Sequence, residues 1–337
     1  MSIRWIPLLL PLLLAAQPKK IVMTAGSAQN WAVNEDALRQ YRSAAPGARI
    51  VVVQPQDLAR EIEDADAVIG SLTPDLFAKA RKLKWVQTYS AGVEAFAFKA
   101  FVDSDVTLTN CKIVQGPNIA DHAMAMLLAF TRGMNRYIPG RLKEEWNRED
   151  PGLLELNGMT AVVIGVGGIG SQIAVRANAF GMRVIGVDPK DLPHMPFLAR
   201  TVTPDRLDEV LPEADVVFVS APLTAESKGM MGRRQFELMK SNGYFIAVSR
   251  GELYDTPALV QALDSKKLAG AGLDVTVPEP LPKGHALWKF ENVIVTPHVA
   301  THSPKSRSRR VNVIKENIAR FAKGEKLINI VEKQRGY

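Results

Sequence analysis

Three side chains that can do acid–base and anion-binding chemistry each follow an apolar stretch late in the chain: Arg250, Glu279 and His298. The stretches are GYFIAVS (243–249), AGAGLDV (269–275) and NVIVTP (292–297). These stretches have the pattern of buried strands, and in an open parallel sheet ligands bind beyond the carboxyl ends of the strands. An arginine there can bind two oxygens of an anion, and a histidine can transfer a proton because imidazole titrates near neutral pH. We therefore predict that the three side chains meet over one pocket.

A second motif is glycine-rich. The segment GVGGIG has the spacing G-x-G-x-x-G; it follows the apolar stretch TAVVI and precedes SQIAVRANAF. This strand–turn–helix context is the one in which the motif binds the pyrophosphate of a dinucleotide at a helix N-terminus. The predicted contacts come from Gly165, Gly167, Gly168, Ile169 and Gly170.

Asp188 ends the next expected strand after the glycine motif. A carboxylate at this place accepts hydrogen bonds from the adenosine ribose hydroxyls. It would also repel a 2′-phosphate, so the sequence favours NAD over NADP as the cofactor. Lys190, two residues further on, would weaken that repulsion, and NADP stays the less favoured alternative.

The remaining sequence alternates apolar and amphipathic stretches, which predicts two parallel α/β sheets with helices on both faces. Residues 118–137 are apolar nearly all round, which predicts one long helix buried between two domains. A final helix at 306–323 would return to the first domain. We therefore predict a discontinuous substrate domain (19–117 and 300–337) around a nucleotide-binding domain (118–299), both with Rossmann-like or flavodoxin-like folds.

Composition limits the classes of protein to consider. The chain has 337 residues, 47% of them hydrophobic and 23% charged, which is typical of a folded globular protein of two domains. The net charge of +7 suits weak attraction of small anions and does not indicate nucleic-acid binding. The single cysteine, Cys111, excludes an internal disulfide and a cysteine-based zinc site, and we expect it to be a buried small side chain.

Residues 1–18 have the layout of a secretory leader. A basic start precedes the apolar run IPLLLPLLLAA, which ends in two alanines before polar residues. Eleven helical residues would span about 16 Å, which is too short to cross a bilayer. The leader predicts a periplasmic or secreted protein without a stable membrane span, and a cytoplasmic location is the alternative.

Five motifs occur in one order along the chain: GVGGIG, SAPLT, VSRGELYD, GLDVTVPEPLP and NVIVTPHVA. Together they resemble the D-isomer-specific 2-hydroxyacid dehydrogenases over about residues 20–333. The resemblance implies NAD-dependent interconversion of a 2-keto acid and a D-2-hydroxy acid. It also implies a homodimer formed through the NAD-binding domain.

On this resemblance, Arg250, Glu279 and His298 fall on the family's catalytic Arg, Glu and His. Arg250 would bind the substrate carboxylate and carbonyl, His298 would act as the acid/base, and Glu279 would fix its tautomer and favour its protonated form. The loop 88–92 falls on the substrate-carboxylate loop, where the Ala91 and Gly92 N–H groups would hold the carboxylate. The remaining implied contacts are Tyr89 and Ser90 for the substrate, and Ala221, Pro222, Val248, Ser249 and Asp274 for the cofactor.

Two other functions remain open from the sequence. One is a non-catalytic NAD-binding protein similar to transcriptional corepressors of this fold. The other is a sister formate or phosphonate dehydrogenase, and Glu279 argues against the formate enzyme. Among the other histidines, His122 is interpreted as structural, with contact to cofactor or substrate as the alternative, while His194, His285 and His302 are expected at the surface.

Overall fold

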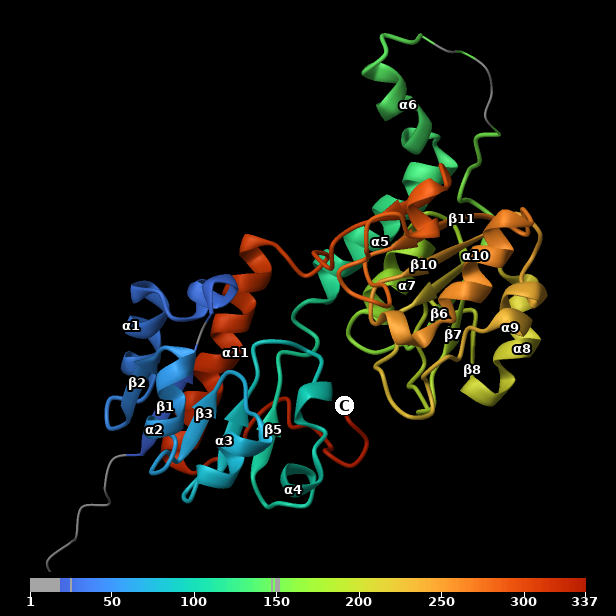
Figure 1. The fold of residues 1–337 in the computed structure, drawn as a ribbon. Coiled ribbons are helices and arrows are strands. Elements are labelled where there is room, and N and C mark those ends of the chain that lie inside the picture. Colours follow the sequence, from blue (N-terminus) through green and yellow to red (C-terminus); the bar gives the residue numbers. More distant parts are fainter. Residues whose placement is uncertain (1–18, 25, 147, 149–151) are drawn as a thin grey trace, which may run out of the picture.

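The computed structural model describes residues 19–24, 26–146, 148 and 152–337, and the predicted leader lies outside these ranges. The chain forms two parallel sheets, each covered by helices, and the two units lie side by side (Figure 1). This confirms the predicted fold class. None of the helices described is long and apolar enough to cross a membrane.

The first sheet has five parallel strands in the order β2-β1-β3-β4-β5, the flavodoxin-like order. Its strands are β1 (Lys20–Thr24), β2 (Arg49–Val53), β3 (Ala67–Ile69), β4 (Trp85–Gln87) and β5 (Thr107–Thr109). The helices beside it are α1 (Glu35–Ala44), α2 (Leu58–Glu61), α3 (Pro74–Lys79), α4 (Lys99–Val102) and α11 (Pro304–Lys323).

The two ends of the described chain share the core of this first sheet. On α1, Tyr41 is buried, and the Asn34 side chain caps the helix by accepting a 2.9 Å hydrogen bond from the Ala37 N–H. On α11, Ile314 and Ile318 are buried in the same hydrophobic cluster. The last helix therefore lies on the first sheet although the second sheet separates the two in sequence.

The second sheet has seven parallel strands in the order β12-β11-β10-β9-β6-β7-β8. Its strands are β6 (Thr160–Ile164), β7 (Arg183–Val187), β8 (Arg200–Val202), β9 (Val216–Val219), β10 (Gly243–Ala247), β11 (Leu268–Leu273) and β12 (Val293–Val295). Strand β6 lies between β7 and β9, so the strand order reverses there, and such a switch point is where dinucleotides bind.

Helices and short turns complete this second unit. The helices are α5 (Gly116–Thr131), α6 (Met134–Arg141), α7 (Gly170–Ala179), α8 (Leu207–Val210), α9 (Arg233–Leu238) and α10 (Thr256–Asp264). The 3-10 turns of the whole described chain are η1 (Ser27–Ala32), η2 (Pro55–Asp57), η3 (Glu94–Phe96), η4 (Pro204–Arg206), η5 (Leu211–Glu213), η6 (Gly251–Leu253) and η7 (Ala286–Lys289).

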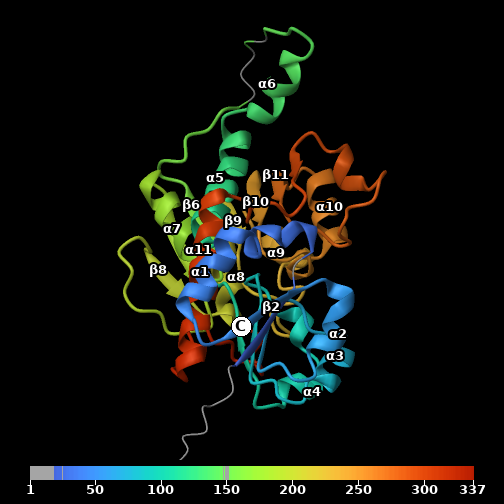
Figure 2. The same ribbon diagram turned by 90° about the vertical axis from the view of Figure 1, so that its left-hand side faces the viewer.

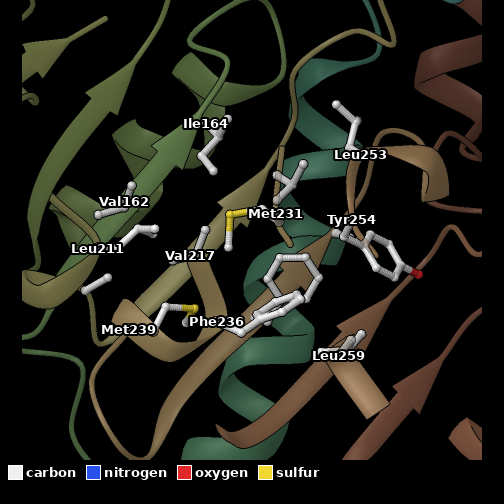
Figure 3. Packing of buried hydrophobic residues seen from close by; sticks show 14 of the residues in the cluster. Val162, Ile164, Leu211, Val217, Met231, Phe236, Met239, Leu253, Tyr254 and Leu259 are labelled. Carbon is white, nitrogen blue, oxygen red and sulfur yellow. The ribbon is translucent and has the colours of Figure 1, made fainter. Parts of the chain in front are cut away.

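The sheet's central strands are apolar on both faces because helices cover both. Residues Val162 and Val217 from neighbouring strands pack with Phe236 of α9 and Leu259 of α10 (Figure 3). Such continuous apolar strands are typical of a parallel sheet buried on both sides. The sheet is therefore a firm base for the loops at its carboxyl edge.

The long helix predicted at 118–137 is wrong, because the structure has two helices there. Gly133 adopts a left-handed conformation (φ 68°) between α5 and α6, and a glycine in that conformation ends a helix. Helix α5 packs against α7, β10 and β11, whereas α6 has no buried residue and projects away from the molecule (Figures 1 and 2). The apolar pattern thus combined one buried helix with one exposed helix.

Candidate active site

Three adjacent strands deliver the predicted acid–base and anion-binding residues to one edge. Strands β10, β11 and β12 are neighbours and parallel, so their carboxyl ends lie at the same edge of the sheet. Arg250 follows β10, Glu279 follows β11 and His298 follows β12. The sheet topology therefore places the three residues at one edge of the sheet.

His298 and Glu279 form a direct pair. The imidazole Nδ1 lies 3.0 Å from Glu279 Oε2, and both side chains are more than a third exposed (37% and 39%). Since an ionised carboxylate only accepts hydrogen bonds, Nδ1 carries the hydrogen, and Nε2 is the ring atom left for a substrate. The second carboxylate oxygen of Glu279 accepts a 2.9 Å hydrogen bond from the Thr276 N–H, which fixes the direction of the carboxylate.

The backbone of His298 is held in a left-handed conformation, with φ 53°. For a residue other than glycine this costs about 1–3 kcal/mol, so surrounding contacts must hold it. Buried Asp274 supplies them: its backbone oxygen accepts from the His298 N–H (2.9 Å), and its carboxylate accepts from the N–H groups of Val299 and Ala300 (both 3.0 Å). Asp274 therefore orients the loop that carries the histidine.

His122 connects α5 to the same loop. Its Nε2 lies 2.9 Å from Thr296 Oγ1, which in turn donates a 2.6 Å hydrogen bond to Asp274 Oδ1. This supports the structural interpretation of His122. Of the other histidines, His194 and His302 are exposed, while Nδ1 of half-buried His285 accepts a 3.2 Å hydrogen bond from the backbone N–H two residues on.

Arg250 is held by a residue that the sequence motifs did not indicate. Glu94 Oε1 lies 3.1 Å from Arg250 Nε, and Glu94 Oε2 accepts from Nη2 at 3.3 Å, while Nη1 donates to the Ser249 carbonyl at 2.7 Å. A guanidinium has five N–H groups, so one on each terminal nitrogen is left at the free end of the fork. These two are spaced to bind the two oxygens of a carboxylate or of a keto-acid O=C–C=O group.

The same arginine touches the predicted substrate loop. A Cβ added to Gly92 would lie 1.8 Å from Arg250 Nη2, so the guanidinium lies directly over this glycine. The hydrogen bonds of the described chain use the carbonyl oxygens of Ala91, from Asn110 Nδ2 (2.7 Å), and of Gly92, from Ser90 Oγ (2.7 Å), but neither N–H group. Both N–H groups are thus available to an anion.

Tyr89 belongs to the predicted substrate loop, but its side chain is buried away from it. Its ring is buried edge-on against Trp31 (5.8 Å between centroids), and its hydroxyl donates to the Ile69 carbonyl at 3.3 Å. The Tyr89 side chain belongs to the hydrophobic core of the first sheet, whereas the next residue, Ser90, is exposed. Any contribution of Tyr89 to a substrate site is therefore through its backbone.

Each glycine of the motif has its own structural reason. Gly165 has φ 83°, and a Cβ there would lie 2.5 Å from the Ala221 N, while a Cβ on Gly170 would lie 1.9 Å from the Gly165 oxygen. A Cβ on Gly167 would meet no atom within 4 Å and would point into open space. This open cradle before helix α7 fits a pyrophosphate that approaches the backbone. The residues present therefore fit a dinucleotide.

Asp188 lies beside this cradle at the end of β7. Its Oδ2 accepts from the Val166 N–H (2.9 Å) and its Oδ1 from the Lys190 N–H (3.0 Å), so its carboxylate is fixed against the glycine loop. This is the geometry expected of a residue that accepts from ribose hydroxyls.

A cleft of about 930 Å³ opens between the glycine loop and the first domain. Of the predicted cofactor-binding residues it is lined by Gly165, Gly167, Asp188, Ala221 and Pro222. Two other glycines of the motif are covered by the protein itself, because Gly168 packs on Ile113 and Gly170 packs on Gly165. The remaining predicted cofactor-binding residues also lie outside the wall of the cleft: Ile169, Val248, Ser249 and Asp274. The three predicted catalytic residues, Arg250, Glu279 and His298, do not line the cleft either. The cleft therefore corresponds to the adenosine and pyrophosphate half of a dinucleotide. Within the described ranges, no three or more His, Cys, Asp or Glu side chains are grouped to hold a metal ion.

Comparisons with known proteins agree with this geometry. The NAD binding domain of D-isomer specific 2-hydroxyacid dehydrogenases matches residues 124–300. A glyoxylate reductase of Korarchaeum cryptofilum is 32% identical over 87% of this chain and 89% of its own length. A D-3-phosphoglycerate dehydrogenase of Methanocaldococcus jannaschii is 30% identical over 89% of this chain, which spans only 58% of that longer relative.

Solved structures show the same fold. An NADPH-dependent glyoxylate/hydroxypyruvate reductase of Sinorhizobium meliloti, in complex with NADP and sulfate, superimposes with a TM-score of 0.81 at 28% identity and covers 95% of this chain and 100% of its own. A D-isomer specific 2-hydroxyacid dehydrogenase family protein of Aeromonas salmonicida gives a TM-score of 0.80 at 26% identity, covering 94% and 100%. As the ordered motifs predicted, the chain belongs to the D-isomer specific 2-hydroxyacid dehydrogenases, a family of oxidoreductases that use a pyridine nucleotide.

Proposed function

We propose that the protein interconverts a small 2-keto acid and the corresponding D-2-hydroxy acid with NAD as its cofactor. The observation that carries this proposal is the His298–Glu279 pair, 3.0 Å apart, at the sheet edge that also carries Arg250. A corepressor-like protein without catalysis has no need for an acid/base pair with its ring nitrogen directed by a carboxylate.

His298 is the proton donor in the direction of keto-acid reduction. Hydride transfer to the carbonyl carbon is the chemistry that a reduced nicotinamide would supply when bound. His298 Nε2 gives a proton to the carbonyl oxygen, and in the reverse direction it accepts the hydroxyl proton. Glu279 holds Nδ1–H throughout, so the proton always enters and leaves at Nε2.

Arg250 and the loop at Ala91 and Gly92 bind the substrate carboxylate. The two N–H groups at the free end of the Arg250 fork bind one carboxylate oxygen and the carbonyl oxygen, which aligns the carbonyl for attack. Glu94 keeps the fork in this direction by occupying its other edge. The names of the relatives support glyoxylate and hydroxypyruvate as the first substrates to test.

The fixed carboxylate of Asp188 supports NAD rather than NADP. Its charge lies beside the glycine loop, where a 2′-phosphate would be repelled. Several structural neighbours are complexes with NADPH or NADP, so the preference of this chain is a matter for measurement.

The test is NADH and NADPH oxidation by the purified protein with a panel of 2-keto acids. We expect turnover of at least one short 2-keto acid, with a higher kcat/KM for NADH than for NADPH. Formate- or phosphite-dependent reduction of NAD, or no turnover with any member of the panel, would refute the proposed reaction.

We also propose a homodimer formed through the NAD-binding domain. In the described part of the chain, helix α6 and the residues that follow it as far as Trp146 expose several large apolar side chains. They are Met134, Tyr137, Ile138, Leu142 and Trp146, the last of them 86% exposed. An apolar arm of this kind is typical of a subunit interface. Light scattering during gel filtration should give twice the chain mass, and Ile138→Asp should give the monomer.

A further inference from the structure

The end of the chain lies between the two units and forms part of the cofactor cleft. The residues Glu332–Tyr337, which we call the C-terminal strap, follow the last contacts of the chain with the first sheet (Figure 1). The Val331 N–H donates to the Leu108 carbonyl of β5 at 2.9 Å. Lys333 Nζ donates to the carbonyl oxygens of Phe101 (2.9 Å) and Ser104 (2.6 Å). The strap is thus attached to the first domain.

The strap then turns back on itself and reaches the second domain. The Glu332 N–H donates to the Tyr337 carbonyl (3.1 Å), and the Arg335 and Gly336 N–H groups donate to the Glu332 carbonyl (both 2.9 Å). This closed turn places the half-buried Tyr337 ring against Lys190, whose Nζ lies 4.7 Å from the ring centroid. A cation–π contact therefore connects the strap to the loop after Asp188.

This contact lies where the adenosine end of a dinucleotide belongs. The cleft wall beside Asp188 and Lys190 includes five consecutive strap residues, Lys333, Gln334, Arg335, Gly336 and Tyr337. The glycine loop lines the same cleft through Gly165, Val166 and Gly167. An aromatic ring in such a wall offers a stacking surface for a base, as in many nucleotide sites.

We propose that the C-terminal strap is a binding element for the adenosine half of the cofactor, with Tyr337 as its contact residue and Lys190 as its tether. The proposal rests on the proposed function, because it assigns further residues to the same dinucleotide site. It predicts that the strap strengthens the binding of NADH and has no effect on the binding of a ligand that consists of the nicotinamide half alone.

The experiment compares two fluorescent ligands: NADH, and reduced nicotinamide mononucleotide, which lacks the adenosine half. The variants are Tyr337→Ala, Tyr337→Phe, Lys190→Gln and a deletion of residues 332–337, with Glu325→Gln as a control at an exposed site outside the cleft. Fluorescence titration gives Kd for each ligand, and circular dichroism melting checks that each variant folds.

We expect Tyr337→Ala and the deletion to raise Kd for NADH about 5- to 20-fold, the lower part of the range for one base–aromatic stacking contact. Tyr337→Phe, which keeps the ring, and Glu325→Gln should stay within twofold of wild type, and Lys190→Gln should have an intermediate effect. Kd for the mononucleotide should be unchanged in every variant.

Three results would overturn the proposal. Unchanged NADH binding in Tyr337→Ala and the deletion would show that the strap makes no contact with the cofactor. Equal weakening of both ligands would show a general effect on the fold. Wild-type protein that binds neither ligand would refute the proposed function itself, and the strap's role with it.

Discussion

Replacing Gly92 by alanine tests whether the guanidinium of Arg250 must lie over Gly92 in order to bind the substrate. The new Cβ would lie 1.8 Å from Arg250 Nη2, 2.7 Å from Glu94 Oε2 and 2.9 Å from Arg250 Cζ. Ordinary contact begins at 3.4 Å, so Nη2 must retreat by about 1.6 Å, the difference between the two distances. The atoms that move are the far ends of two flexible side chains, so the backbone can stay in place.

The magnitude follows from this displacement. A misplacement of about 1 Å at a positioning group can cost about 10²-fold in rate. We therefore expect Gly92→Ala to lower kcat/KM for the 2-keto acid by about 10²-fold, which is about 2.7 kcal/mol of transition-state stabilisation. The effect on NADH binding should be small by comparison, because Gly92 and Arg250 lie outside the wall of the cofactor cleft and Glu94 is the one displaced residue that lines it.

The assay is steady-state NADH oxidation, with NADH binding followed separately by fluorescence. Gly47→Ala is the matched control, because a Cβ there meets no atom within 4 Å. It should have wild-type kinetics and a wild-type melting temperature. A Gly92→Ala enzyme with kcat/KM within threefold of wild type would refute the placement of the substrate under the Arg250 fork.

Four further predictions address the pair, the cofactor site and the cysteine. Glu279→Gln should lower kcat about 10- to 10³-fold, because an amide does not hold one tautomer of His298, while the fluorescence Kd for NADH stays unchanged. Gly167→Ala should raise that Kd more than tenfold without lowering the melting temperature, since its Cβ enters only the open cradle. Asp188→Ala should raise KM for NADH by an amount equivalent to about 1–3 kcal/mol, and it should reduce the ratio of kcat/KM for NADH to kcat/KM for NADPH. A wild-type protein that already prefers NADPH would contradict the role given to Asp188. Burial raises the pKa of the Cys111 thiol to about 12, so Ellman's reagent at pH 8 should detect a thiol only after unfolding. An unfolded thiol ionises near pH 8.5, so chemical denaturation should show the free energy of unfolding falling as the pH rises above this value.

The sequence was most informative where the functional residues come directly after a strand. Glycine spacing after β6, and the residues that follow β10, β11 and β12, are local patterns, and parallel pairing alone brings Arg250, Glu279 and His298 to one edge. The alternation of apolar and amphipathic stretches also predicted two parallel sheets, but not their two different strand orders. Several of the covering helices are short, and the ends of such helices depend on caps and turns rather than on periodicity.

The features that the sequence did not indicate depend on contacts between distant segments. Glu94 and Arg250 are separated by 156 positions, and no period or motif relates a loop acid to one particular arginine. The strap reaches Lys190 only because the last helix returns to the first sheet. The apolar sequence pattern around Gly133 is the same whether a helix continues through this residue or ends there. The left-handed conformation of Gly133 shows that the helix ends.

The chirality of the product tests the central claim most directly. Wild-type protein and the His298→Ala variant would each be incubated with NADH and hydroxypyruvate or a longer 2-keto acid, and the 2-hydroxy acid separated by chiral chromatography. We expect wild type to form only the D-isomer, one molecule for each NADH oxidised. The variant should form it about 10²- to 10⁴-fold more slowly with unchanged NADH binding. An L or racemic product, or a variant as fast as wild type, would contradict the account.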